Sequence, residues 1–199
     1  MKNRFILLSM LFVMNIFMTH KSFAQNNERI KHLIKFNLAP IFVGEFMPYY
    51  EYTFNKKISG EIGIGFVTDN YLQNFVQETN GSTTRIHKNG PAFTLAARYY
   101  PYRIAELIYC TAEVKYRRYR KAYQQFTTDG STEENIEFNQ RIIPRIGLGY
   151  HRFLDDHFLI DLSANLGLGF EKKLQTSYEV PISKYFLNFG IGFKLAYAL

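Results

Sequence analysis

The feature that most constrains this chain is an alternation of apolar and polar residues with a period of two. From residue 185 to 199 every second residue is apolar or aromatic, and the residues between them are small or polar. Successive side chains of a β-strand point to opposite faces, so the pattern predicts a strand with one apolar face. The same alternation recurs at 33–38, 46–54, 58–67, 91–100, 108–119, 136–150 and 158–170. An all-β fold of eight strands is therefore predicted.

The connections between these strands alternate in length. Short ones are expected at 55–57, 101–107 and 151–156, and mostly longer polar ones at 39–45, 68–90, 120–135 and 171–182. With an even strand number, the termini and the short turns fall at one end and the loops at the other. This is the layout of outer-membrane barrels. The prediction is an eight-stranded antiparallel up-and-down transmembrane β-barrel over residues 25–199.

The first residues have the pattern of an export signal. Lys2 and Arg4 precede an apolar run at 5–18, and Ser22-Phe23-Ala24 supplies small residues before a cut. A signal peptide over 1–24, cleaved after Ala24, is predicted. The apolar run is shorter than the about 20 residues that a spanning helix needs.

Charge and cysteine content limit the possible partners. Removing the predicted signal lowers the net charge from +7 to +4, so the basic balance belongs partly to export and no nucleic-acid partner is expected. Cys110 is the single cysteine, which excludes an internal disulfide.

The polar face of the strands carries the charges, whereas the apolar face has almost none apart from Arg118. An eight-stranded barrel has an interior that side chains just fill, so these charges are predicted to pair as a structural network with no open pore. An alternative is a narrow ion path favouring anions, because seven bases face four acids. The predicted lumen residues are Lys35, Glu51, Glu61, Arg98, Glu113, Lys115, Arg117, Arg141, Arg145, Asp161 and Lys194.

Periodicity alone does not say which face lies inside. Strands near or above the about 9–11 residues that cross a bilayer, the export signal and aromatic residues at strand ends favour an apolar face in outer-membrane lipid. The alternative is an exported soluble lipocalin-like barrel that binds an apolar ligand inside. The expected girdles are Tyr50, Tyr52, Phe54, Tyr99, Tyr102, Tyr109, Tyr150 and Tyr197 at the periplasmic rim, and Phe66, Tyr116, Tyr119, Phe170 and Tyr185 at the outer rim.

A pattern of apolar-Gly-apolar-Gly-aromatic residues occurs at 62–66, 146–150, 166–170 and 189–193. A dinucleotide site would need a third glycine and a following helix, so no cofactor is expected. The glycines share the charged face, where they are predicted to thin the inner wall or ease strand curvature.

Several short motifs resemble those of a known family. They are the signal end at Ala24-Gln25, Glu51-Tyr52 before a short turn, Arg98-Tyr99-Tyr100-Pro101, Tyr116-Arg117-Arg118-Tyr119 and the Gly-x-Gly-aromatic strand ends. Together they resemble small outer-membrane barrel proteins of the OmpA/OmpX-like superfamily, in particular a subset with no assigned function. The resemblance implies an eight-stranded transmembrane barrel and no catalytic residues. Residues 188–195 resemble the C-terminal signal read by the barrel assembly machinery, which implies that machinery as a partner.

Two groups of residues could suggest chemistry. His87 lies near Ser82, Thr83 and Thr84, as in lipid-modifying barrel enzymes, but in an expected polar loop. His151, Asp155, Asp156 and His157 could ligate a metal, yet such residues are typical of turns.

No catalytic, metal or cofactor site is therefore expected. The expected protein is a scaffold in the bacterial outer membrane, not an enzyme, whose surface loops serve interaction or adhesion with an unidentified extracellular partner.

Overall fold

The computed structural model describes residues 31–69, 84–101, 108–126, 132–155, 157–175 and 181–199. No helix in these ranges is long and apolar enough to cross a membrane. The elements are β1 (His32–Asn37), the 3-10 helix η3 (Ala39–Val43), β2 (Glu45–Phe46), β3 (Pro48–Thr53), β4 (Ile58–Val67), β5 (Thr84–Tyr99), β6 (Ile108–Phe126), β7 (Thr132–Phe153), β8 (Phe158–Gln175) and β9 (Ile182–Ala198).

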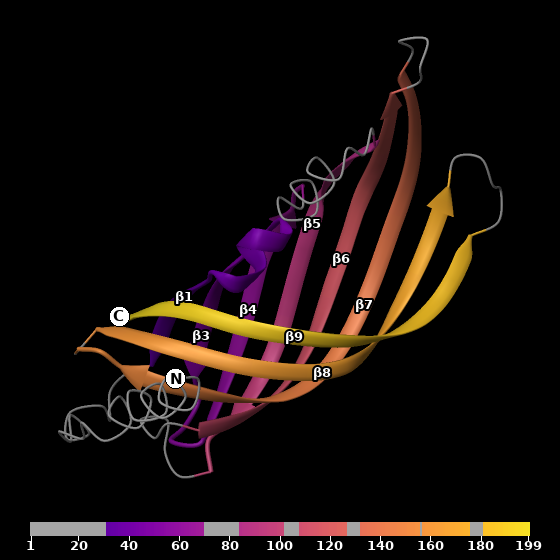
Figure 1. Cartoon of the computed structure of the whole chain (residues 1–199). Coiled ribbons are helices and arrows are strands. Elements are labelled where there is room, and N and C mark those ends of the chain that lie inside the picture. The colour runs from indigo at the N-terminus through magenta and orange to yellow at the C-terminus, as the bar shows by residue number, and fades with distance from the viewer. Residues whose placement is uncertain (1–30, 70–83, 102–107, 127–131, 156, 176–180) are drawn as a thin grey trace, which may run out of the picture.

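All nine strands in the described ranges belong to one antiparallel sheet whose ends meet. The order is β2-β4-β3-β1-β9-β8-β7-β6-β5, and β4 also pairs with β5, so the hydrogen bonds form a closed ring. The first and last strands are neighbours in this ring, with Leu33 opposite Ala198 and Asn37 opposite Lys194. Figure 1 shows the resulting barrel-like shape. The predicted all-β antiparallel fold is confirmed.

The strand count differs from the prediction of eight because the first predicted hairpin is interrupted. β2 has two residues, is separated from β3 by Met47 alone, and pairs with the same neighbour, β4. Met47 is buried, and its sulfur accepts a 3.3 Å hydrogen bond from the Thr94 hydroxyl. Gly65 allows the backbone of Met47 and Phe46 to approach β4 where a Cβ atom would collide.

Several strands continue into segments that were expected to be loops. β5 begins at Thr84 rather than residue 91, β6 continues to Phe126 and β8 to Gln175. In Figure 1, β5 to β9 extend beyond β1, β3 and β4 at one end of the sheet. The residues of these extensions are largely polar on both faces of the strand. The backbone pairing continues there, but the apolar–polar alternation by which a strand is recognised in the sequence is absent.

Pro144 interrupts the pairing on one side of β7 without introducing a bulge. The register between β7 and β8 is the same before and after it, and the pairs opposite residues 143 and 144 are missing. Proline has no N–H to donate, which accounts for the missing pairs. Gly167 on β8 accommodates the Pro144 carbonyl, because a Cβ at this position would meet that oxygen.

The charged face lies inside and the apolar face lies outside. Lys35, Glu51 and Asp161 are fully buried, whereas Ile146 is 71% exposed and Leu187 70%. Exposed apolar side chains occur on every long strand of the ring. The lipocalin-like alternative required the apolar face inside, and the structure contradicts it.

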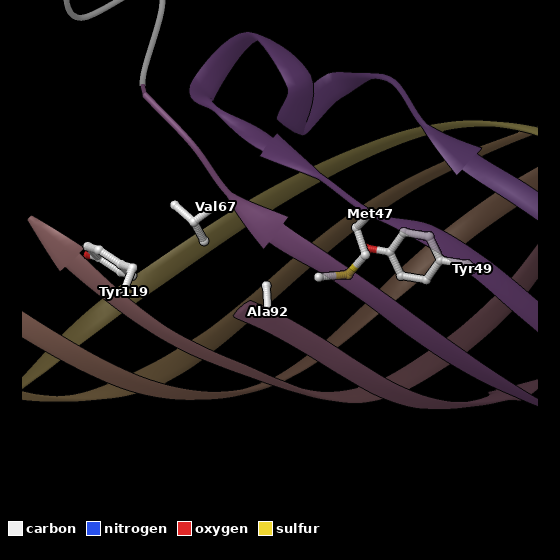
Figure 2. Packing of buried hydrophobic residues seen from close by; sticks show 5 residues of the cluster. All are labelled: Met47, Tyr49, Val67, Ala92 and Tyr119. Atoms are coloured by element: carbon white, nitrogen blue, oxygen red, sulfur yellow. The ribbon is translucent and has the colours of Figure 1, made fainter. Parts of the chain in front are cut away.

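Small apolar clusters also lie in the interior. Met47, Tyr49, Val67, Ala92 and Tyr119 form one cluster, whose side chains project into the space that the strands enclose (Figure 2). Leu33, Leu159, Ala196 and Ala198 form another, with Phe153 packed against it.

The prediction of aromatic girdles is wrong for two residues. Tyr109 and Tyr119 are buried in the interior, because they lie an even number of residues from Glu113 and so share its face. Tyr116 keeps the outward parity, and Tyr102 lies outside the described residues.

Two tight turns lie at the end of the sheet near the C-terminus (Figure 1). In the turn between β3 and β4, Asn55 Oδ1 accepts hydrogen bonds from the backbone amides of Lys57 and Ile58, at 2.8 and 2.9 Å. Asp155 does the same between β7 and β8 with His157 and Phe158, at 2.8 and 2.7 Å. These amides of Phe158 and His157 stabilise the carboxylate and lower the pKa of Asp155 below its ordinary value.

A buried network of charged side chains

Three acids from three different strands meet inside the ring. Glu51 on β3, Glu61 on β4 and Asp161 on β8 each present one carboxylate oxygen, and these oxygens lie within 4.8 Å of one another. All three side chains have zero exposure. Three carboxylates this close repel one another strongly unless cations lie between them.

Arg98 on β5 is the cation that reaches all three acids. Its guanidinium donates hydrogen bonds to Glu61 from Nη2 and to Asp161 from Nη1, both at 2.6 Å, and Nη1 lies 3.3 Å from Glu51. The guanidinium carbon also lies 4.4 Å from the ring centroid of Tyr109. A planar guanidinium suits this task because it donates in several directions at once.

Two lysines complete the cluster. Lys35 on β1 pairs with Glu51 and donates to Asp161 at 2.7 Å. Lys194 on β9 donates to Glu61 at 2.5 Å and lies 4.1 Å from the ring centroid of Tyr49. The six charges therefore balance, three against three.

Hydroxyl groups satisfy further acceptor positions of the acids. Tyr100 donates to Glu51 at 2.8 Å, Ser59 donates to the same carboxylate, and Tyr109 donates to Asp161. The ring of His151 packs against Tyr100 with a centroid distance of 5.3 Å. None of these four residues was predicted to lie in the interior. Each of them lies an even number of positions from a predicted interior residue close to it in the sequence and so shares its face. The pairs are Ser59 and Glu61, Tyr100 and Arg98, Tyr109 and Glu113, and His151 and Arg145.

The spacing of the three carboxylates is compatible with a metal ion, but protein cations are already in place. Lys35 and Arg98 both lie within bonding distance of Asp161 Oδ2. The charge that a metal would neutralise is thus neutralised by the chain itself.

The remaining predicted residues pair further along the interior. Lys115 and Arg117 both pair with Glu45, and Arg145 pairs with Glu113. Arg141 Nε donates to Glu171 at 2.6 Å. Every residue of the predicted set thus has an oppositely charged partner.

Three of the acids in these pairs were not predicted. Glu45, Glu137 and Glu171 fall in or at the ends of segments expected to be loops or weakly patterned strands. In the structure Glu171 also pairs with Lys184 at 3.1 Å, and Glu137 with Lys173 at 3.0 Å. These three acids reduce the excess of basic over acidic side chains in the interior, on which the alternative of a narrow anion path depended.

The residues considered for a metal site in the last short turn do not converge. His151 was expected in the turn but lies in β7, buried inside the ring. Asp155 caps the turn, and the His157 ring packs on Tyr197 with a centroid distance of 5.6 Å. Asp156 lies outside the described residues.

The histidine considered for catalysis also lies on a strand rather than in a loop. His87 belongs to β5, and its Nδ1 lies 2.8 Å from Asp69 Oδ2. Ser82 and Thr83 lie outside the described residues.

Comparison with known proteins supports the fold alone. No family model and no curated protein matches the chain. A major outer membrane protein from Thermus thermophilus has a similar structure, with a TM-score of 0.53, 10% identity, and coverage of 84% of this chain and 98% of that one. The N-terminal β-barrel domain of OprF from Pseudomonas aeruginosa aligns with a TM-score of 0.40 and 13% identity over 85% of this chain and 98% of that domain, too low a score to carry an argument. The fold of this chain is thus similar to that of a bacterial outer-membrane protein.

Proposed function

We propose that the chain is an integral β-barrel of the bacterial outer membrane, in which β2 and β3 act as one of eight spanning strands. The observation that carries the proposal is the inverted distribution of side chains, with charges inside and apolar residues outside around the ring. The OmpA/OmpX-like resemblance, the export signal and cleavage after Ala24 are parts of the same proposal.

The exposed apolar surface is what makes water an unfavourable solvent for this fold. Leu95, Ile146, Leu166, Leu187 and Phe189 are each at least half exposed. Soluble monomers rarely expose apolar patches above a few hundred Å², and each Å² costs about 25 cal/mol in water. Lipid removes this cost, and a closed ring leaves few backbone groups unpaired in the bilayer.

We propose that the interior is a structural filling rather than a pore. Glu51, Glu61 and Asp161 are sealed from solvent and held by three cations of the same cluster. The central cluster has no excess of positive charge that would select anions. This favours the closed scaffold over the narrow ion path.

The remaining functions belong to the surface loops. We propose that the protein is not an enzyme, that outer-membrane lipid and the barrel assembly machinery are its partners, and that an extracellular partner binds the loops. Function on loops held by a rigid sheet is a common arrangement.

Cys110 tests whether the outer face meets lipid. It is exposed on the outward face of β6. In cells, a bilayer-soluble maleimide should modify it, whereas a charged thiol reagent should react at least about tenfold more slowly, because the apolar interior of a bilayer excludes a charged reagent. Mass spectrometry of the purified protein measures both products.

Cys110→Ala/Lys57→Cys moves the thiol to the exposed turn, where the charged reagent should react once the outer membrane is permeabilised. Equal reaction of Cys110 with both reagents would contradict the membrane proposal.

Orientation is tested by epitope insertion. An epitope within residues 70–83 should be recognised by antibody on intact cells, because β4 ends and β5 begins at the opposite end of the sheet from the short turns. An epitope at Asn55 should be recognised only after permeabilisation. Flow cytometry with and without permeabilisation measures the difference. Labelling of the short turn on intact cells would reverse the proposed topology.

A further inference from the structure

The outward face changes character abruptly between two adjacent rows of residues on β6 to β9. In the first row Tyr116 lies opposite Ile142, Ile142 opposite Phe170, and Phe170 opposite Tyr185. The next outward row consists of Arg118, Gln140, Lys172 and Ser183, each opposite the next. An aromatic row is therefore followed directly by a polar row that contains two cations.

The two cations have no acidic partner among the described residues. Arg118 and Lys172 are exposed, and no ion pair within those residues involves either side chain. The acids beside them along β7 and β8, Glu137 and Glu171, face the interior and pair with Lys173 and Arg141. The positive charge of this row is thus not neutralised by the described part of the protein.

A surface pocket lies at the same place. Its volume is about 360 Å³, and its lining includes Arg118, Gln140 and Lys172 together with the apolar Phe138, Leu174 and Pro181. Two strand spacings separate the β6 and β8 backbones here, roughly 10 Å, so an arginine and a lysine side chain can reach one anionic group between them. The pocket combines two donors of positive charge with apolar walls.

We propose that this pocket binds the phosphate group of an outer-leaflet lipid. Arg118 and Lys172 would contact the phosphate, Gln140 would donate a hydrogen bond between them, and the acyl chains would lie along the aromatic row below. Arginine and lysine both suit phosphate oxygens, and cations at an interface attract anionic headgroups. The inference rests on the proposed membrane insertion, which supplies the lipid and its orientation.

The test uses the folded barrel in detergent and native mass spectrometry. The probes are phosphatidic acid and phosphatidylcholine with the same acyl chains. The native protein should retain phosphatidic acid in preference to phosphatidylcholine, and Arg118→Gln/Lys172→Gln should weaken that preference by roughly fivefold for each cation removed. Lys56→Gln/Lys57→Gln removes the same charge from the opposite end and should leave the preference unchanged.

Three results would overturn the site. They are an unchanged preference in Arg118→Gln/Lys172→Gln, an equal loss in Lys56→Gln/Lys57→Gln, and displacement of the lipid by millimolar inorganic phosphate, which would show that phosphate binds without its chain. The heat-modifiable gel shift verifies that each variant is folded. Because Cys110 labelling tests insertion separately, a failed lipid site is distinguishable from a failed membrane proposal.

Discussion

Arg98→Met is expected to lower the free energy of unfolding by about 3–5 kcal/mol, because removing one partner of a buried ion pair leaves the other charges uncompensated. Arg98 reaches Glu51, Glu61 and Asp161, so its loss leaves three buried acids with two lysines. The measurement is the temperature at which the folded protein loses its heat-modifiable gel shift. Glu61→Gln should lower that temperature as well, because it removes the carboxylate that pairs with the buried Lys194.

Two outward substitutions are the controls for Arg98→Met. Arg118→Met makes the same chemical change on the outer surface, and Leu187→Ala shortens a side chain that is 70% exposed. Both should cost less. Arg118 and Leu187 are exposed, so neither substitution leaves a buried charge or a core cavity. A larger effect of Leu187→Ala than of Arg98→Met would contradict the stabilising role of the buried charges.

Gly167→Val is expected to destabilise the sheet by about 1–3 kcal/mol, the usual cost of overpacking. A Cβ atom at Gly167 would meet the Pro144 carbonyl oxygen and the Arg145 Cα, both backbone atoms that a change of rotamer cannot move away. Ala164→Val, which adds similar bulk on the outward face of the same strand, should leave the gel-shift temperature nearly unchanged. Equal temperatures for the two variants would refute the steric role of this glycine.

The alternation of residues predicted an all-β antiparallel fold and the residues that share each face of the sheet. Parity placed Asp161 and Lys194 on the charged face, and the structure has them directly opposite each other on β8 and β9. The sequence could not show which residues of distant strands would meet, because Glu51, Arg98 and Asp161 come together only through the closure and stagger of the whole ring.

The errors have two causes. Strands were recognised by their apolar face, so strand segments with two polar faces were read as loops, and Glu45 and Glu171 were left out of the interior. Tyr109 and Tyr119 were assigned to girdles on residue type, although their parity with Glu113 indicated the interior. Parity is set by the backbone and is the stronger guide.

The central cluster has a consequence for the order of folding. The Lys35–Asp161 contact joins residues 126 positions apart, and the Lys194–Glu61 contact joins residues 133 apart. Contacts between such distant residues pay the largest loop-closure entropy and are expected to form last, when β1 meets β9. Interactions absent from the transition state slow unfolding without accelerating folding. The cluster should therefore slow the unfolding of the closed ring far more than it accelerates folding.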